Sequence, residues 1–595
     1  MENLEITQPV DARRLKEFMD VLRRYKTGKA RTEQRIISSE NWWKLRNAQQ
    51  ERSEGVTKSE EFTSCSGWLH NVIVSKHADA MEAYPEPNIL PREAADKPQA
   101  SMLSAIVPCI LEQNHFEQTY SDVMWQKLKT GTGVYKVVWD RSKLLGMGDI
   151  GISRVNLLNI YWEPGVTDIQ KSRYFFHTEL QSKSLLEQRY PQLQDKLEGN
   201  SFLAARFLYD DPVDDSDKIT VVEVYYHKLV DGRDTLQYCK FVGQTVLFAT
   251  ENDPEMSQVG LYDHGMYPYV FDTLYPIEGS PCGYGFVDLC RNPQTEIDLL
   301  KTAFVRNARV GAVPRYFSRI DGNVNEEQFL DLEQPLVKVS GNVDEATLRR
   351  IEHSSLDGNY LTLLDRTVDE LRQTSGNTEA STGAVSSGVT AASAIAALQE
   401  ASGKGSRDAT LNSYRAYSRL VELCIWLIRQ FYDVPRQFRI TGQYGMEQFV
   451  SFDNSALQPK SQGNDFGVEL GYRLPVFDIK VSAQKKNVYT KVSQNELALQ
   501  FFQLGFFNPQ LTDQAMLCLQ MMDFDGKDTI LQQLSGIRAQ MQQMQQMQAA
   551  QAAAQAQRAG EVRLAEADSI EGIKKAEHAN VQKARARALN AAQPR

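Results

Sequence analysis

The stretch from Asn292 to Arg429 constrains the fold most, because it combines three striped helices with a loop that has almost nothing to bury. Asn292 and Pro293 fit the N-cap and first position of a helix, where the missing proline N–H costs little. The residues that follow at helical spacing form one apolar stripe: Ile297, Leu300, Phe304, Ala308 and Gly311. Pro314 ends this first helix.

A second helix with the same design is predicted over residues 359–374. Its stripe consists of Leu361, Leu364, Val368 and Leu371, and its polar face carries Asp365, Arg366, Asp369 and Glu370. Narrow stripes of this kind favour packing of helix against helix over packing on a sheet. From periodicity alone, two ordinary surface helices of a globular domain remain the alternative.

The loop that follows the second helix has an unusual composition. Residues 375–393 read SGNTEASTGAVSSGVTAAS, with no aromatic residue and with Glu379 as the one charge. Such a segment cannot anchor itself in a core, so we expect a loop, and a flexible linker is the alternative. A third helix opens at Ser406 and ends before Pro435, with a face so apolar that it must be buried. A small polar loop between rigid helices suits the lining of a passage for a polymer.

The formal net charge of −10 bears on nucleic-acid binding. Proteins that grip nucleic acid tightly are usually basic, because phosphate neutralisation supplies most of the affinity. An acidic chain could surround DNA as a sleeve but not hold it as a clamp. We also expect no membrane span and no export signal, and the seven scattered cysteines fit a reducing compartment.

The rest of the chain reads as mixed helices and strands. Helices are predicted at 11–50, 62–84 and 101–130, strands at 133–140, 150–158, 219–230, 235–249 and 268–275, and an extended connector at 85–91. Residues 436–482 look irregular or β-like, and helices dominate from Val488. The tail from Gln532 is nearly all Gln, Ala and Met, which predicts either a disordered tail or a long helix that needs neighbouring copies.

No catalytic or metal-binding constellation stands out. Gly146, Gly148 and Gly151 match the spacing of a dinucleotide fingerprint, but they lie between two predicted strands, so a hairpin turn is expected. His70 and His77 share one helical face without a third ligand, so a satisfied or exposed pair is expected. We therefore predict no enzyme activity, no catalytic residues, no metal site and no cofactor.

The order of these segments resembles a known family. The strand GVYKVVWD and the segment YWEPGVTDIQKSRYFFH precede the helix–excursion–helix hairpin, the small-residue loop, the long third helix and the Gln/Ala tail. This arrangement resembles the portal proteins of tailed bacteriophages, particularly the large portals of short-tailed phages. The resemblance implies an α+β, predominantly helical portal fold that assembles into a dodecameric ring at one capsid vertex, through which double-stranded DNA is packaged and later ejected.

The resemblance also assigns regions to the chain. Residues 1–285 and 391–487 would form the wing, 286–312 and 357–375 the two stem helices, and 313–356 the clip. Residues 376–390 would be the tunnel loop, 488–534 the crown and 535–595 the helical barrel.

The implied site residues fall in three groups. The channel loop would present Asn377, Thr378, Glu379, Ser381, Thr382, Ser386 and Ser387, so DNA would meet hydroxyls and an amide instead of basic side chains. The stem would carry Lys301, Arg306 and Arg309, which lie off the first apolar stripe, and the clip would carry Arg315, Tyr316, Phe317 and Arg319.

The implied partners are further copies of the chain, double-stranded DNA, the terminase large subunit, a head–tail adaptor, and the major capsid and scaffolding proteins, with no membrane. The implied location is the capsid vertex of the virion, after assembly in the host cytoplasm. Two other readings stay open: an intracellular nucleic-acid-processing enzyme or motor subunit, and a scaffold or adaptor with a coiled-coil tail.

Overall fold

The structure is a computed structural model, and it describes most of the chain. The described residues are 10–46, 64–191, 202–207, 217–312, 316–318, 348–350, 356–377, 404–441, 447–461, 472–483 and 527–590, with shorter pieces between 464 and 519.

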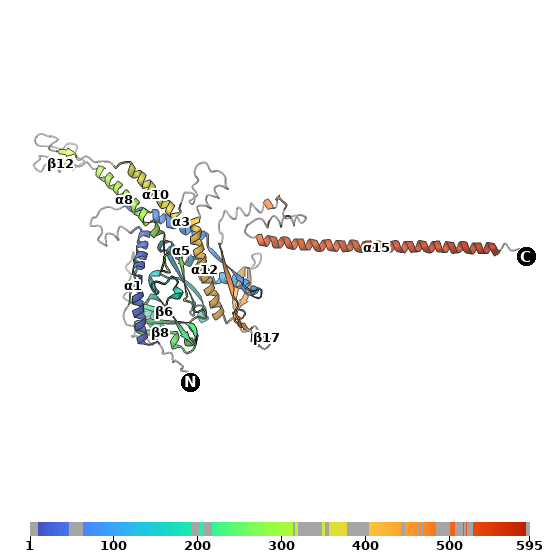
Figure 1. Ribbon diagram of the computed structural model, residues 1–595, viewed down its shortest axis with the longest axis horizontal. Coiled ribbons are helices and arrows are strands. Elements are labelled where there is room, and N and C mark those ends of the chain that lie inside the picture. Colours follow the sequence, from blue (N-terminus) through green and yellow to red (C-terminus); the bar gives the residue numbers. More distant parts are fainter. Residues whose placement is uncertain are drawn as a thin grey trace. The chain divides into compact units, whose positions relative to one another are not determined.

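The chain divides into two compact units, Met1–Gln484 and Lys485–Arg595. The first unit mixes helices and sheets, and the second is dominated by one long helix (Figure 1). Helical residues outnumber strand residues in the part of the chain that the structure describes. The predicted mixture of α and β structure with a helical majority is therefore confirmed at this level.

Among the described residues, the first unit opens with the helices α1 (Ala12–Trp43), α3 (Trp68–Glu82), α4 (Lys97–Gln113) and α5 (Phe116–Thr130). Residues 101–130 are helical as predicted, but they are divided between two helices, because the chain breaks between α4 and α5. His115 has a φ of 49°, a left-handed conformation that cannot continue a right-handed helix. The side chain of Asn114 donates to the carbonyl of Ile110 at 2.8 Å and helps to end α4.

Residues 85–91 are extended, as was predicted, and they also form a paired strand, which was not predicted. β1 (Pro85–Pro91) pairs antiparallel with β20 (Phe477–Ala483) along its whole length. Arg92, just beyond β1, also forms an ion pair with Asp478 at 2.7 Å. The pairing joins two segments that lie far apart in the sequence.

A three-stranded antiparallel sheet has the order β3-β2-β9, built from β2 (Thr132–Asp140), β3 (Asp149–Arg154) and β9 (Tyr269–Thr273). Gly146 and Gly148 lie in the β2–β3 turn and Gly151 lies in β3, opposite Val138, so the predicted hairpin is confirmed. Gly148 has a φ of 78°, and a Cβ there would lie 2.7 Å from the ring of Trp139. Glycine at position 148 therefore allows the tight turn between β2 and β3.

A five-stranded antiparallel sheet has the order β4-β5-β6-β7-β8. Its strands are β4 (Ile160–Tyr161), β5 (Tyr174–Ser182), β6 (Lys218–Val230), β7 (Arg233–Val242) and β8 (Thr245–Ala249). The single strand predicted over 235–249 is in fact a hairpin, because the chain turns at Gly243, whose φ is 57°. Short helices α6 (Lys183–Arg189) and α7 (Met256–Val259) adjoin this sheet.

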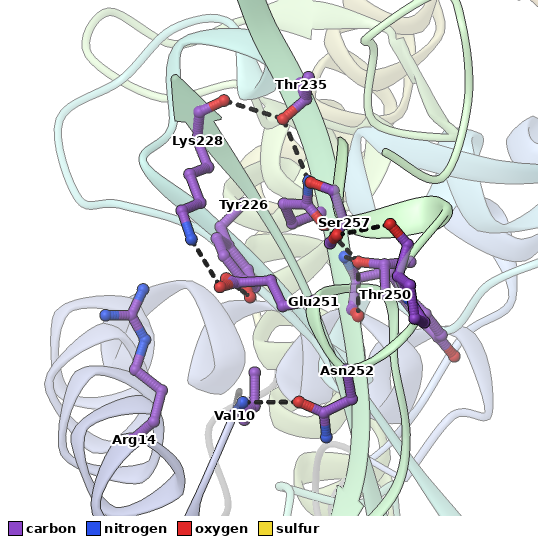
Figure 2. A network of polar contacts seen from close by, with 12 residues as sticks. Val10, Arg14, Tyr226, Lys228, Thr235, Thr250, Glu251, Asn252 and Ser257 are labelled. Atoms are coloured by element: carbon purple, nitrogen blue, oxygen red, sulfur yellow. Dashed lines mark hydrogen bonds and ion pairs between the residues drawn. The ribbon is translucent and has the colours of Figure 1, made fainter. Parts of the chain in front are cut away.

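Helix α1 packs on the five-stranded sheet through a small core of its own. Leu15, Phe18 and Leu22 from α1 meet side chains from the sheet, among them Phe176, Val224 and Phe241. Polar contacts lie beside the start of the helix (Figure 2): the Val10 N–H donates to Asn252 at 2.7 Å, and Glu251 accepts from Tyr226 and from Lys228 at 2.7 Å. The helix itself begins after its N-cap Asp11, whose side chain accepts from the Arg14 N–H at 2.9 Å.

The largest core gathers around α12 (Lys404–Phe431). Its buried residues include Leu420, Val421, Cys424, Leu427 and Ile428, which confirms the prediction that this helix is buried. β14 (Arg436–Thr441) and β15 (Glu447–Phe452) follow and pair with each other, as the β-like pattern of 436–482 predicted. Three further ladders consist of two-residue strands: β10 (Tyr275–Pro276) with β11 (Gly283–Tyr284), β16 (Lys460–Ser461) with β19 (Tyr472–Arg473), and β17 (Asn464–Asp465) with β18 (Val468–Glu469).

The second unit contains α15 (Lys527–Asn590), a helix of 64 residues. At a rise of 1.5 Å per residue it extends for roughly 100 Å. Of the two alternatives for the tail, the long helix is the one observed. Met544 and Met547 are mostly exposed on it, as are Ile570 and Ile573.

Candidate functional site: a helical hairpin and its anchor

Helices α8 (Phe286–Ala312) and α10 (Asn359–Ser375) lie side by side as a hairpin (Figure 1). α8 begins six residues before the predicted N-cap, so Asn292 and Pro293 are inside the helix and that part of the prediction was wrong. The helix starts where Asp288 accepts a hydrogen bond from the Gly285 N–H at 3.2 Å. Burial of Phe286, Val287 and Cys290 in a core cluster explains why the helix extends upstream.

The hairpin is buried at one end and exposed at the other. Ile297 and Leu371 belong to the core cluster that also holds Trp42 and Leu69, and Leu364 and Val368 pack against it. Several large apolar side chains elsewhere on the two helices are exposed: Leu299, Val310, Tyr360, Leu361 and Leu363. In a single copy, these side chains leave part of the hairpin with an apolar surface in water.

Three polar residues at successive turns of α8 hold the segment that leads into α3. Thr302 accepts from the Ser64 N–H at 2.9 Å, and Asp298 accepts from the Ser66 N–H at 2.8 Å and from the Ser66 hydroxyl. Gln294 accepts from the Leu69 N–H at 3.0 Å. The N–H groups in the first turn of a helix have no partner within that helix. Gln294, which belongs to α8, therefore caps the first turn of α3.

Helix α3 also holds the end of α10. Gly376 takes the left-handed conformation that terminates helices, and the Asn377 N–H donates to the Arg372 carbonyl at 3.0 Å. Ser75 donates to the Asn377 side chain at 3.3 Å, and Lys76 to the Gly376 carbonyl at 3.4 Å. The chain thus leaves α10 beside α3.

The chain returns beside the same helix. The Tyr414 hydroxyl on α12 donates to the carbonyl of Ala83, directly after α3, at 3.0 Å. Buried Lys127 donates to the Ala409 carbonyl at 3.1 Å and to the Ser413 hydroxyl at 2.6 Å, and it forms an ion pair with Asp272 at 2.6 Å. Both flanks of residues 378–403 are therefore fixed in the same neighbourhood.

Short strands follow α8 and precede α10. β12 (Tyr316–Ser318) pairs antiparallel with β13 (Leu348–Arg350), with Tyr316 opposite Arg350 and Phe317 opposite Arg349. Two of the predicted clip residues, Tyr316 and Phe317, lie in this ladder. Arg315 and Arg319 lie outside the described residues.

The other candidate residues differ in their exposure, and some of them lie outside the described residues. Lys301, Arg306 and Arg309 are exposed on α8. Asn377 is buried at the end of α10, and the rest of the predicted loop set lies outside the described residues: Thr378, Glu379, Ser381, Thr382, Ser386 and Ser387. The anchor residues Gln294, Asp298 and Thr302 were missed as a group, although their spacing of four residues could have identified one polar face.

The two histidines singled out in the sequence pack on tryptophans. The ring of His70 stacks on Trp43 with a centroid distance of 4.1 Å, and that of His77 stacks on Trp125 at 3.7 Å. Burial lowers the pKa of His77, which favours the neutral ring. Among the residues that the structure describes, no group of His, Cys, Asp or Glu is arranged to hold a metal ion. None of the described helices is long and apolar enough to cross a membrane.

The comparison with known families agrees with the resemblance seen in the sequence. The model of the family described as "Phage P22-like portal protein" matches residues 79–266 and 233–584. These two overlapping matches span most of the chain, including the α8–α10 hairpin and most of α15, and they begin in the last turn of α3. No curated protein matches the chain. The chain therefore belongs to the family of phage P22-like portal proteins.

Proposed function

We propose that copies of this chain form a dodecameric ring whose central channel conducts double-stranded viral DNA into and out of the capsid. The ring would stand at one capsid vertex of the virion after assembly in the host cytoplasm. In this proposal the chain has a structural role, as the portal family in general does, and no catalytic one.

The observation that carries the proposal is the hairpin with one buried end and an exposed apolar surface. Leu361 and Leu363 are about half exposed in a single copy. Identical neighbours placed around an axis would cover such side chains, since a repeated contact between unlike faces gives a ring when its rotation closes after a whole number of copies. The α8–α10 pair would then be the stem.

The described flanks of residues 376–390 support the assignment of this segment as the tunnel loop. Asn377 leaves the hairpin beside α3, and Tyr414 returns beside the end of the same helix. A segment with both flanks fixed in one place suits a constriction better than a linker between domains. Its serines and threonines would touch the DNA backbone without ionic attraction, which suits a chain that carries a net charge of −10.

The remaining regions follow the same scheme. The strands β12 and β13 would belong to the clip that meets the terminase large subunit and later the head–tail adaptor. The wing would meet the major capsid and scaffolding proteins, and α15 would form the barrel with its copies.

Bulky residues in the tunnel loop test this function. We expect Ser386→Trp combined with Ser387→Trp to leave the ring intact and to lower DNA packaging at least tenfold, because the larger side chains would obstruct the constriction. Ser451→Trp, at an exposed position of β15, is the matched control. Packaging is measured as DNA protected from nuclease, and rings are counted in electron micrographs. Unchanged packaging by the double variant would contradict the assignment of the loop.

A further inference from the structure

A second feature of the first unit has no part in the proposed channel. A cleft of about 690 Å³ opens between the β2–β3 hairpin and strands β6, β7 and β8. This volume is within the usual range for sites that bind small molecules or short peptide segments. The cleft lies in the wing region, away from the hairpin and its anchor on α3.

The floor of the cleft carries a nearly buried charge cluster. Glu223 forms ion pairs with Lys136 at 2.7 Å and with Lys240 at 3.2 Å, and all three side chains are less than a fifth exposed. His177 lies 3.4 Å from the same carboxylate. Burial and the neighbouring Lys136 lower the pKa of His177, so the ring is neutral at pH 7. Two ammonium groups facing one carboxylate leave a net positive charge.

The rim adds to this positive charge. Arg141 is exposed at the end of β2, and Lys143 donates to Asn114 at 2.7 Å and to the Ile150 carbonyl at 2.9 Å. Asp140 and Glu223 are the acidic residues of the lining, against four basic ones: Lys136, Arg141, Lys143 and Lys240. The cleft is thus locally basic in a chain whose net charge is −10. An anionic group would be attracted to it.

The walls of the cleft are apolar and aromatic. Trp139 and Phe431 stack on each other with centroids 4.7 Å apart, and Tyr238 packs against Phe248 at 6.0 Å. This stacking covers one face of the Trp139 ring and one face of the Phe431 ring. Leu247 and Leu261 provide aliphatic surface for a side chain.

The sheet supplies a place for an extended backbone. β8 is the outermost strand of the five-stranded sheet, and its residues Leu247 and Phe248 line the cleft. An outer strand presents backbone groups that can pair with an added peptide strand. We propose that the cleft binds an acidic peptide segment of a partner protein, with a large apolar side chain between the aromatic walls and carboxylates at the basic rim.

Fluorescence anisotropy with the full-length chain tests this proposal. The probe is a short fluorescein-labelled peptide of aspartate and glutamate around a central Leu-Phe pair. We expect saturable binding, and we expect Arg141→Glu to raise the dissociation constant roughly fivefold because it reverses an exposed charge at the rim. Lys16→Glu, an equally exposed reversal on α1, is the matched control and should leave binding unchanged.

Altered probes separate the two parts of the site. Replacing the Leu-Phe pair of the peptide by serines, or its acidic residues by lysines, should weaken binding at least tenfold. Absence of saturable binding, or equal effects of the two charge reversals, would overturn the proposal. Preferential binding of oligothymidylate at the same site would assign the cleft to nucleic acid instead. None of these results depends on whether the chain forms a channel.

Discussion

Asp298 shows how one buried side chain connects the hairpin to the rest of the first unit. It accepts hydrogen bonds from both the backbone and the hydroxyl of Ser66 and from the Gln294 amide, the last at 3.1 Å. A buried carboxylate needs such donors, because leaving water costs a charged group more than any other. In a helical-wheel pattern the same residue reads as part of the solvated polar face.

Removal of this carboxylate should loosen the anchor. We expect Asp298→Ala to lower the free energy of unfolding by about 2–3 kcal/mol, since it removes the carboxylate that accepts from the buried Ser66 N–H and from the Ser66 hydroxyl. Asp365→Ala, at an exposed position of α10, is the control and should change stability little. Chemical denaturation monitored by tryptophan fluorescence measures both. Equal stability of the two variants would show that the anchor is dispensable.

Lys29 provides a test that depends on pH. Its ammonium group is buried, where it donates to the carbonyls of Leu157 at 2.5 Å and Ile160 at 2.6 Å. Burial lowers its pKa from 10.5 to about 8, although Glu33 opposes the shift. Above pH 8 the folded chain holds Lys29 neutral while the unfolded chain still binds the proton, so stability rises with pH in this window.

We therefore expect the wild-type chain to gain roughly 1 kcal/mol of stability between pH 7 and pH 9 relative to Lys29→Met. Comparison with the variant removes the contributions of other groups that titrate in the same range. Denaturant titrations of both proteins at several pH values give the difference. A difference that stays constant with pH would contradict the lowered pKa.

At the scale of elements, periodicity identified the helices but not their ends or partners. The stripes of α8 and α10 were visible because they face a core on one side. The capping signal of Asn292 and Pro293 placed the start of α8 six residues too late, because burial of Phe286 and Val287 overrides it. The pairing of β1 with β20 could not be foreseen, since a strand's sequence does not specify a partner some 390 residues away.

For some candidate site residues the exposure could be predicted from the sequence, and for others it could not. The exposed positions of Lys301, Arg306 and Arg309 could be predicted because charged side chains lie off an apolar stripe. The burial of Asn377 could not, because it depends on Ser75 of a distant helix. Hydrogen bonds between elements are the information that one sequence does not contain.

The apolar surface of the hairpin makes a prediction about assembly. We expect Leu363→Glu to prevent ring formation and to leave the fold of the single chain intact, because Leu363 is already half exposed before assembly. Leu229→Glu, at an exposed leucine on the β6–β7 turn, is the matched control. Size-exclusion chromatography reports assembly, and circular dichroism reports the fold. Normal rings formed by Leu363→Glu would exclude this face as a contact between copies.

In the whole molecule, both units leave apolar side chains exposed to water in a single copy. The hairpin leaves apolar side chains exposed, and α15 is a helix of 64 residues with isoleucines and methionines facing water. A helix of this length with so little to bury gains most of its stability from packing against other helices. Neighbouring copies of the chain would cover the exposed apolar side chains of both units.

The mass of the assembled particle tests the central claim most directly. Native mass spectrometry of the purified chain should show one closed species at twelve times the chain mass of 67.4 kDa, with electron micrographs of the same sample showing rings around a central hole. A stable monomer or dimer under all assembly conditions, or particles without a hole, would contradict the account.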